Sequence, residues 1–172
     1  MSRDANSSRL QALLAPTGTG EPRIAPARPR ELGLLARAVA VIIARVTGTG
    51  PPNIFTTLGR HPRLFRAWLR YSAHLMPFGT LPRPDTELVI LRVAWRCGSA
   101  YEWHQHVPLA LRVGLTAAEV AGAAGEPHGF TARRQALLAA VDELLADRAL
   151  TDTTWRAVRD ALSEREAIEL FL

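Results

Sequence analysis

The chain has 172 residues, which suits one compact domain, and its 48% hydrophobic and 22% charged residues are ordinary values for a globular protein. Its 21 basic residues are all arginines, and against 16 acidic residues they give a net charge of +5. The arginines are scattered, with no clear basic stripe or helix-turn-helix pattern, which argues against nucleic acid as the main partner. The single cysteine, Cys97, excludes a disulfide within the chain, and a buried small side chain is the simplest expectation for it.

Nothing near the N-terminus predicts secretion or membrane insertion. Residues 1–8 are polar, and no long apolar run follows them directly. The apolar stretch 34–46 is interrupted by Arg37 and Arg45 and is too short to span a bilayer. We therefore expect a cytoplasmic protein that does not contact membranes.

Proline and glycine divide the chain into an N-terminal arm and a helical domain. Residues 1–30 are rich in proline, glycine, arginine and small polar residues, which predicts an extended arm. From residue 31 to residue 172 the apolar residues recur with a helical period, and no segment alternates as a strand would. Proline starts, serine and threonine caps and glycine stops mark the ends of the helices. The expected helices cover residues 31–46, 53–58, 62–74, 84–97, 99–113, a short segment after Thr116, 131–147, 151–162 and 163–172. The sequence therefore predicts an all-α fold.

The most informative polar residues lie on one of these helices. Ser99, Glu102 and His106 are spaced i, i+3 and i+7, so a helix places their side chains on one stripe. The same stripe continues with apolar residues, which indicates that it faces inward. Because a buried carboxylate and a buried imidazole are costly without partners, these groups either satisfy one another in the core or line a cavity that binds a ligand.

This spacing favours acid–base chemistry. Glu102 and His106 are four residues apart, and a neighbouring carboxylate raises the pKa of an imidazole and selects its tautomer. His106 is therefore a candidate general acid or base, with Glu102 as its orienting partner. Glu87, near the start of the preceding helix, could reach the same place as a second acid. The alternative is a buried network of these three residues that only stabilises the fold.

Four further residues are candidates for substrate contacts: Ser99, Cys97, His61 and Trp103. For Ser99 a helix N-cap is a better interpretation than a nucleophile. Trp103 suits core or subunit packing as well as a pocket wall, and His61 suits capping or packing as well as the mouth of a pocket. No cluster of metal ligands, phosphate-binding loop or dinucleotide fingerprint is evident, so we expect no metal and no cofactor.

Four segments, in this order, resemble the carboxymuconolactone decarboxylase family of the alkylhydroperoxidase D-like superfamily. They are PNIFTTLGRHP at 52–62, ELVILRVA at 87–94, YEWHQH at 101–106 and GLT at 114–116. The resemblance covers roughly residues 31–172. It implies a compact helical domain of the alkylhydroperoxidase D-like type that assembles as a homotrimer or homohexamer and acts on a small molecule.

The resemblance also implies the branch of that superfamily without redox chemistry. Redox members carry Cys-x-x-Cys followed by His, with a Glu upstream. Anchored on His106, the two cysteine positions hold Ser99 and Glu102, and Glu87 matches the upstream acid. Many relatives have a basic residue just before that acid where this chain has Thr86, which leaves the partner of Glu87 open. Relatives often continue past the position of Leu172, which predicts a more open pocket or subunit contact here.

The predicted function is a cofactor-free enzyme, similar to carboxymuconolactone decarboxylase. Its reaction would be decarboxylation, proton transfer or elimination on a small oxygenated carbon acid or lactone, from aromatic catabolism or secondary metabolism. His106 would be the acid or base, Glu102 its orienting partner and Glu87 the second acid. Two other functions stay open: a thiol-dependent peroxidase that uses Cys97 with a thiol from another subunit, and a helical binding or assembly module without catalysis.

Overall fold

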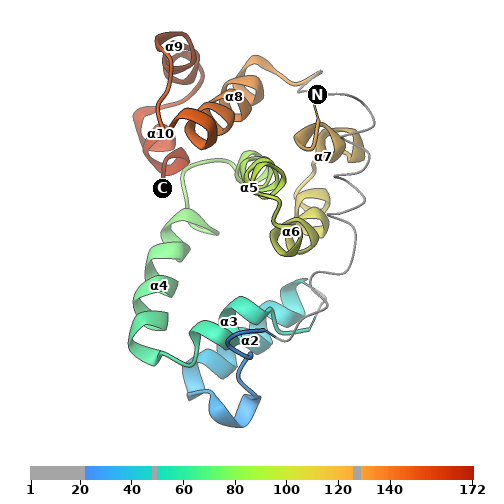
Figure 1. Ribbon diagram of the computed structural model, residues 1–172, viewed down its shortest axis with the longest axis vertical. Coiled ribbons are helices and arrows are strands. Elements are labelled where there is room, and N and C mark those ends of the chain that lie inside the picture. Colours follow the sequence, from blue (N-terminus) through green and yellow to red (C-terminus); the bar gives the residue numbers. More distant parts are fainter. Residues whose placement is uncertain (1–21, 48–49, 126–128) are drawn as a thin grey trace. The chain divides into compact units, whose positions relative to one another are not determined.

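The computed structural model describes residues 22–47, 50–125 and 129–172, and all regular structure in this part is helical (Figure 1). Residues 1–21 of the expected arm lie outside it. The all-α prediction is confirmed for these residues. The elements are η1 (Pro29–Glu31), a 3₁₀ turn, followed by the α-helices α2 (Leu34–Thr47), α3 (Asn53–Leu58), α4 (Pro62–Leu75), α5 (Arg83–Cys97), α6 (Ala100–Arg112), α7 (Ala117–Ala123), α8 (Ala132–Asp147), α9 (Asp152–Ala161) and α10 (Glu164–Leu170).

These residues form two units, 22–78 and 79–172. The first unit contains η1 and α2 to α4. Its helix α4 begins at Pro62, and the ring of Phe65, which is 1% exposed, stacks against Trp68. Helix α2 begins three residues later than expected because residues 29–31 form a separate 3₁₀ turn.

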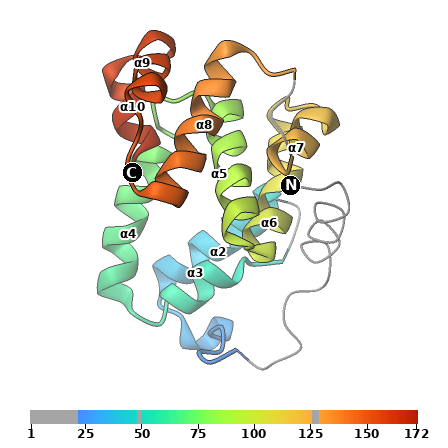
Figure 2. The same cartoon turned by 45° about the horizontal axis from the view of Figure 1, so that its top comes forward.

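In the second unit, α5 is the central helix and packs against α6, α7 and α8 (Figures 1 and 2). Leu88, Leu91 and Trp95 of α5 are at most 3% exposed and belong to a core that also takes in residues of α6, α7 and α8. A second core joins α8, α9 and α10. Burial on several sides of α5 fits its nearly continuous apolar sequence.

Helix ends in the second unit follow their expected capping residues. Thr116 and Ser163 each form a capping box with the glutamate three residues later, Glu119 and Glu166. Leu145, near the end of α8, is 42% exposed. Within residues 22–47, 50–125 and 129–172, no helix is both long and apolar enough to cross a membrane.

Candidate functional site

The site is built on α5 and α6, which are joined by a turn of two residues. Gly98 ends α5 with a φ of 67°, a left-handed conformation that glycine adopts without strain. The Ser99 hydroxyl then caps α6 by accepting a hydrogen bond from the Glu102 backbone N–H at 3.4 Å. This turn packs α6 against α5, so a residue near the start of α5 lies beside one near the end of α6.

The structure places the His106 imidazole between two carboxylates. His106 Nδ1 lies 2.7 Å from Glu87 Oε2, and its Nε2 lies 3.4 Å from Glu102 Oε2. The Glu87 side chain is fully buried, His106 is 12% exposed and Glu102 is 40% exposed. Each ring nitrogen therefore faces a different environment: Nδ1 points into the protein, and Nε2 points toward a carboxylate that is open to solvent.

Arg83 completes the site on its buried side. Its Nη2 donates to Glu87 Oε1 at 2.5 Å, one helical turn along α5. The hydroxyl of Thr86 instead bonds the carbonyls of Leu81 and Pro82. Arg83 is thus the cationic partner of Glu87, a role that the sequence left open and that the i, i+4 spacing of Arg83 and Glu87 could have indicated. The Nη1 of Arg83 is buried and has no hydrogen-bond partner among the described residues.

The two carboxylates determine the charge of the imidazole. Burial by itself lowers the pKa of His106 because the charged form loses its hydration. The hydrogen bonds with Glu102 and Glu87 and their negative charges outweigh this effect and raise the pKa to about 9. Both ring nitrogens can donate to carboxylates only when the ring is protonated, so the geometry also favours the imidazolium. His106 therefore carries a positive charge at neutral pH.

The other sequence candidates lie in different surroundings. Ser99 is next to this group as the N-cap of α6, while Trp103 is 3% exposed and packs on Trp95 in the core. The expectation that Cys97 is buried is wrong: it is exposed, as the last residue of α5 beside the Gly98 turn. His61 belongs to the first unit, where its Nδ1 accepts a hydrogen bond from Leu64 N at 3.2 Å and caps α4.

Glu87, Glu102 and His106 are thus brought together, and Arg83 joins them. The described part of the chain contains no cluster of three or more histidine, cysteine, aspartate or glutamate residues arranged to hold a metal ion. What the arrangement offers is an acidic N–H at Nε2 and a carboxylate beside it, which are the groups needed for proton transfer.

Residues 62–143 match the model of the Carboxymuconolactone decarboxylase family. The match runs from the start of α4 into α8 and includes Arg83, Glu87, Glu102 and His106. No curated protein matches the chain.

Proposed function

We propose that the chain is an acid–base enzyme of the carboxymuconolactone decarboxylase type, which acts on a small oxygenated carbon acid or lactone without a cofactor. One observation carries the proposal: His106 is held as an imidazolium between a buried carboxylate and an exposed one. The match of residues 62–143 to the family model supports the general class of chemistry. The identity of the substrate is part of what the experiment below has to find.

The two carboxylates have different roles in this proposal. Glu87 accepts the Nδ1 proton and, itself fixed by Arg83, sets the orientation and tautomer of the ring. Nε2 is then the nitrogen that gives a proton to the substrate. Glu102, at 3.4 Å from Nε2 and 40% exposed, is close enough to take part and open enough to meet a substrate.

Loss of carbon dioxide illustrates the chemistry. The bond between the carboxylate carbon and its neighbour breaks, and the electron pair moves through that neighbour onto a conjugated carbonyl oxygen. The Nε2–H of His106 stabilises the negative charge on this oxygen. The carbanion carbon then takes a proton from His106, and solvent returns a proton to the ring. In an isomerisation, Glu102 accepts the proton from carbon and His106 protonates the oxygen of the enolate. Glu102 then gives its proton to a second carbon of the enol, and His106 takes back the proton from the oxygen as the carbonyl re-forms.

In the alternative interpretation, Glu87, Glu102 and His106 form a network that only stabilises the fold. The pair of the buried Glu87 and the partly exposed Arg83 would suffice to balance the buried negative charge. The exposure of Glu102 and its long contact with the ring contribute little to packing, and they are what a ligand-facing carboxylate would show. These two features favour the catalytic interpretation.

Exchange of carbon-bound protons with deuterated solvent tests the proposal. A panel of β-keto acids and unsaturated carboxylated lactones would be followed by proton NMR. We expect His106→Gln to lower the rate of exchange or decarboxylation by about 10²- to 10⁴-fold because it removes the acidic N–H. His104→Gln is the matched control on the same helix and should keep the wild-type rate and thermal midpoint.

Two results would contradict the proposal. One is an unchanged rate in His106→Gln. The other is no turnover of any panel member by the wild-type protein together with unfolding of His106→Gln, which is what the structural network predicts. A peroxide-consumption assay separates the thiol alternative, since Cys97→Ser should leave consumption at the background level of the wild type. We also propose the homotrimer or homohexamer that the resemblance implies, which light scattering measures.

A further inference from the structure

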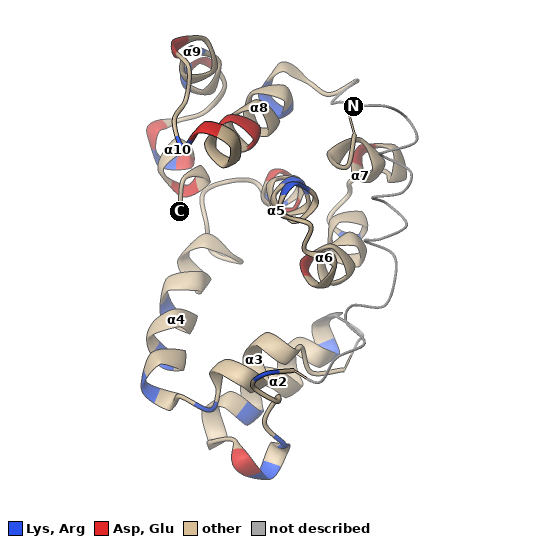
Figure 3. Cartoon of the chain, in the orientation of Figure 1, with Lys and Arg blue, Asp and Glu red and all other residues tan. Residues whose placement is uncertain are grey.

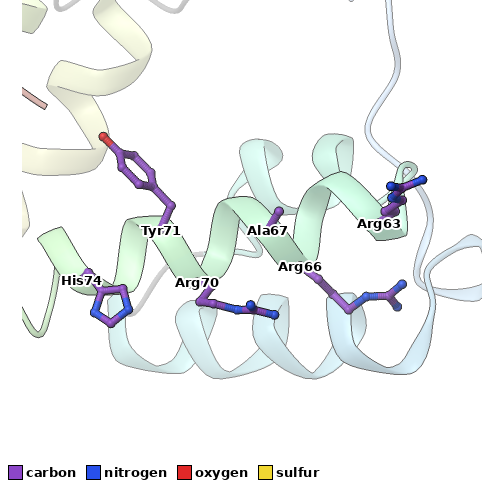
Figure 4. A pocket seen from close by; sticks show the side chains of 6 residues that line it. All are labelled: Arg63, Arg66, Ala67, Arg70, Tyr71 and His74. Carbon is purple, nitrogen blue, oxygen red and sulfur yellow. The ribbon is translucent and has the colours of Figure 1, made fainter.

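A row of cationic side chains follows one side of α4. Arg63, Arg66, Arg70 and His74 are spaced i, i+3, i+7 and i+11, and all are exposed. Together with Ala67 and Tyr71 they line a hollow of about 460 Å³ (Figure 4). In this view the side chains of Arg66, Arg70 and His74 project to the same side of the helix.

Among residues 22–78, this row has no acidic residue paired with it. Residues 22–78 contain nine arginines and one acidic residue, Glu31, a net charge of +8. Glu31 pairs with Arg60 at 3.2 Å. Figure 3 shows α4 with basic and no acidic positions. Among the described residues, Arg63, Arg66 and Arg70 take part in no ion pair.

Helix stability does not explain this row. Like charges three or four residues apart on a helix repel one another and destabilise it. Buried contacts do not require it either, since the buried face of α4 is formed by other residues such as Phe65. The row is therefore a feature of the surface, and it concentrates positive charge beside a hollow.

The chemistry of the row suits phosphate groups. The guanidinium fork donates two parallel hydrogen bonds to a phosphate, and it is weakly hydrated compared with an ammonium group. From residue 63 to residue 74 the helix rises about 16 Å, which is longer than a single phosphate can contact. The hollow runs along α4, because all six residues that line it belong to this helix. Tyr71, 47% exposed, adds an aromatic ring to its lining.

We propose that this hollow on α4 binds a small organic polyphosphate of the size of a nucleoside triphosphate. Arg63, Arg66 and Arg70 bind its phosphate groups. The proposal is independent of the acid–base site, because it uses only residues of the first unit and predicts binding rather than turnover.

Isothermal titration calorimetry of the full chain with ATP and with inorganic tripolyphosphate tests it. The combined variant Arg63→Gln, Arg66→Gln, Arg70→Gln should bind both at least about 100-fold more weakly, because it removes three charge-assisted contacts with the phosphates. The matched control is Arg23→Gln, Arg37→Gln, Arg45→Gln, which removes three exposed charges from the same unit but away from the hollow. It should bind both ligands as the wild type does. Circular dichroism checks that both variants keep their helices, as glutamine is a good helix former.

Several results would overturn the proposal. Equal weakening in the two triple variants would mean that net charge alone attracts the anions and would overturn the site. No binding of ATP or tripolyphosphate, with binding instead to phosphatidylserine vesicles, would overturn it in favour of a membrane surface. Failure of the wild type to bind either ligand would also overturn the proposal.

Discussion

The arginines of the two units are used in opposite ways. In residues 79–172, ten arginines meet thirteen acidic residues, and the arginines of α5 and α8 are joined to carboxylates. Asp85 of α5 accepts from Arg133 at 2.7 Å and from Arg134 at 3.1 Å. Residues 22–78, in contrast, contain a single acidic residue, Glu31. It pairs with Arg60 and not with the row of arginines on α4.

The difference shows how the same side chain serves structure in one place and is left available in another. Arg92 is 5% exposed and binds Asp142 through two nitrogens and the carbonyls of Ala123 and Gly125 through a third. It therefore connects α5 with α8 and with the end of α7. An arginine of this kind is satisfied on every side, whereas the exposed arginines of α4 keep their donors for solvent or a ligand.

The largest loss of stability is expected when the carboxylate partner of a buried arginine is removed. Asp142→Asn leaves the charge of Arg92 buried without its counter-ion, and breaking a buried pair in this way costs about 3–5 kcal/mol. Asp147→Asn, an exposed position at the end of the same helix, should change the free energy of unfolding by no more than about 0.5 kcal/mol. Urea denaturation measures both. Equal effects of the two variants would show that Arg92 is not anchored by Asp142.

A smaller effect is expected from pH at the acid–base site. The pKa of His106 is raised from 6.5 to about 9 in the folded chain. Its contribution to the free energy of unfolding is therefore complete below about pH 6.5 and is lost as the pH rises through 9. The loss amounts to at most about 3 kcal/mol. The lowered pKa values of Glu119, Glu166 and Glu169 act in a separate window, because their stabilisation is lost as pH falls below about 4.5.

Denaturation measured from pH 6 to pH 10 follows this window. Glu87→Gln removes the closest acceptor of the imidazolium and should flatten the decline between pH 6.5 and pH 9. His104→Gln should leave it as steep as in the wild type. An equally steep decline in Glu87→Gln would mean that another group titrates there. The same variant series reports activity, which should persist up to about pH 9 if the imidazolium is the working form.

Local signals in the sequence were sufficient for most of the fold. Capping residues such as Thr116 and Ser163 and the helical period of the apolar residues predict where helices begin and what they bury. The stripe of Glu102 and His106 follows from spacing alone. A single helix period could not reveal which carboxylate approaches the ring more closely, because the contact with Glu87 depends on how α5 and α6 pack.

Contacts between distant residues were not predictable in the same way. Arg92 and Asp142 are separated by 50 positions, and no local pattern links them. The exposure of Cys97 depends on its place at the Gly98 turn, whereas composition alone favours burial of cysteine. The row on α4 was also missed, although its i, i+3, i+7 and i+11 spacing on the expected helix 62–74 could have indicated it.

The smallest effect, and the sharpest test of the contrast between the two units, comes from the stability of the α4 variant. Removing Arg63, Arg66 and Arg70 together breaks no ion pair within the described residues and relieves repulsion between charges three and four residues apart. The free energy of unfolding should therefore stay the same or rise by no more than about 1 kcal/mol, most visibly at low salt, where such repulsion is least screened. A loss of 2 kcal/mol or more, of the order expected for a buried pair, would show that these arginines are structural. The two units would then use their charges alike, and the row on α4 would not be free to bind an anion.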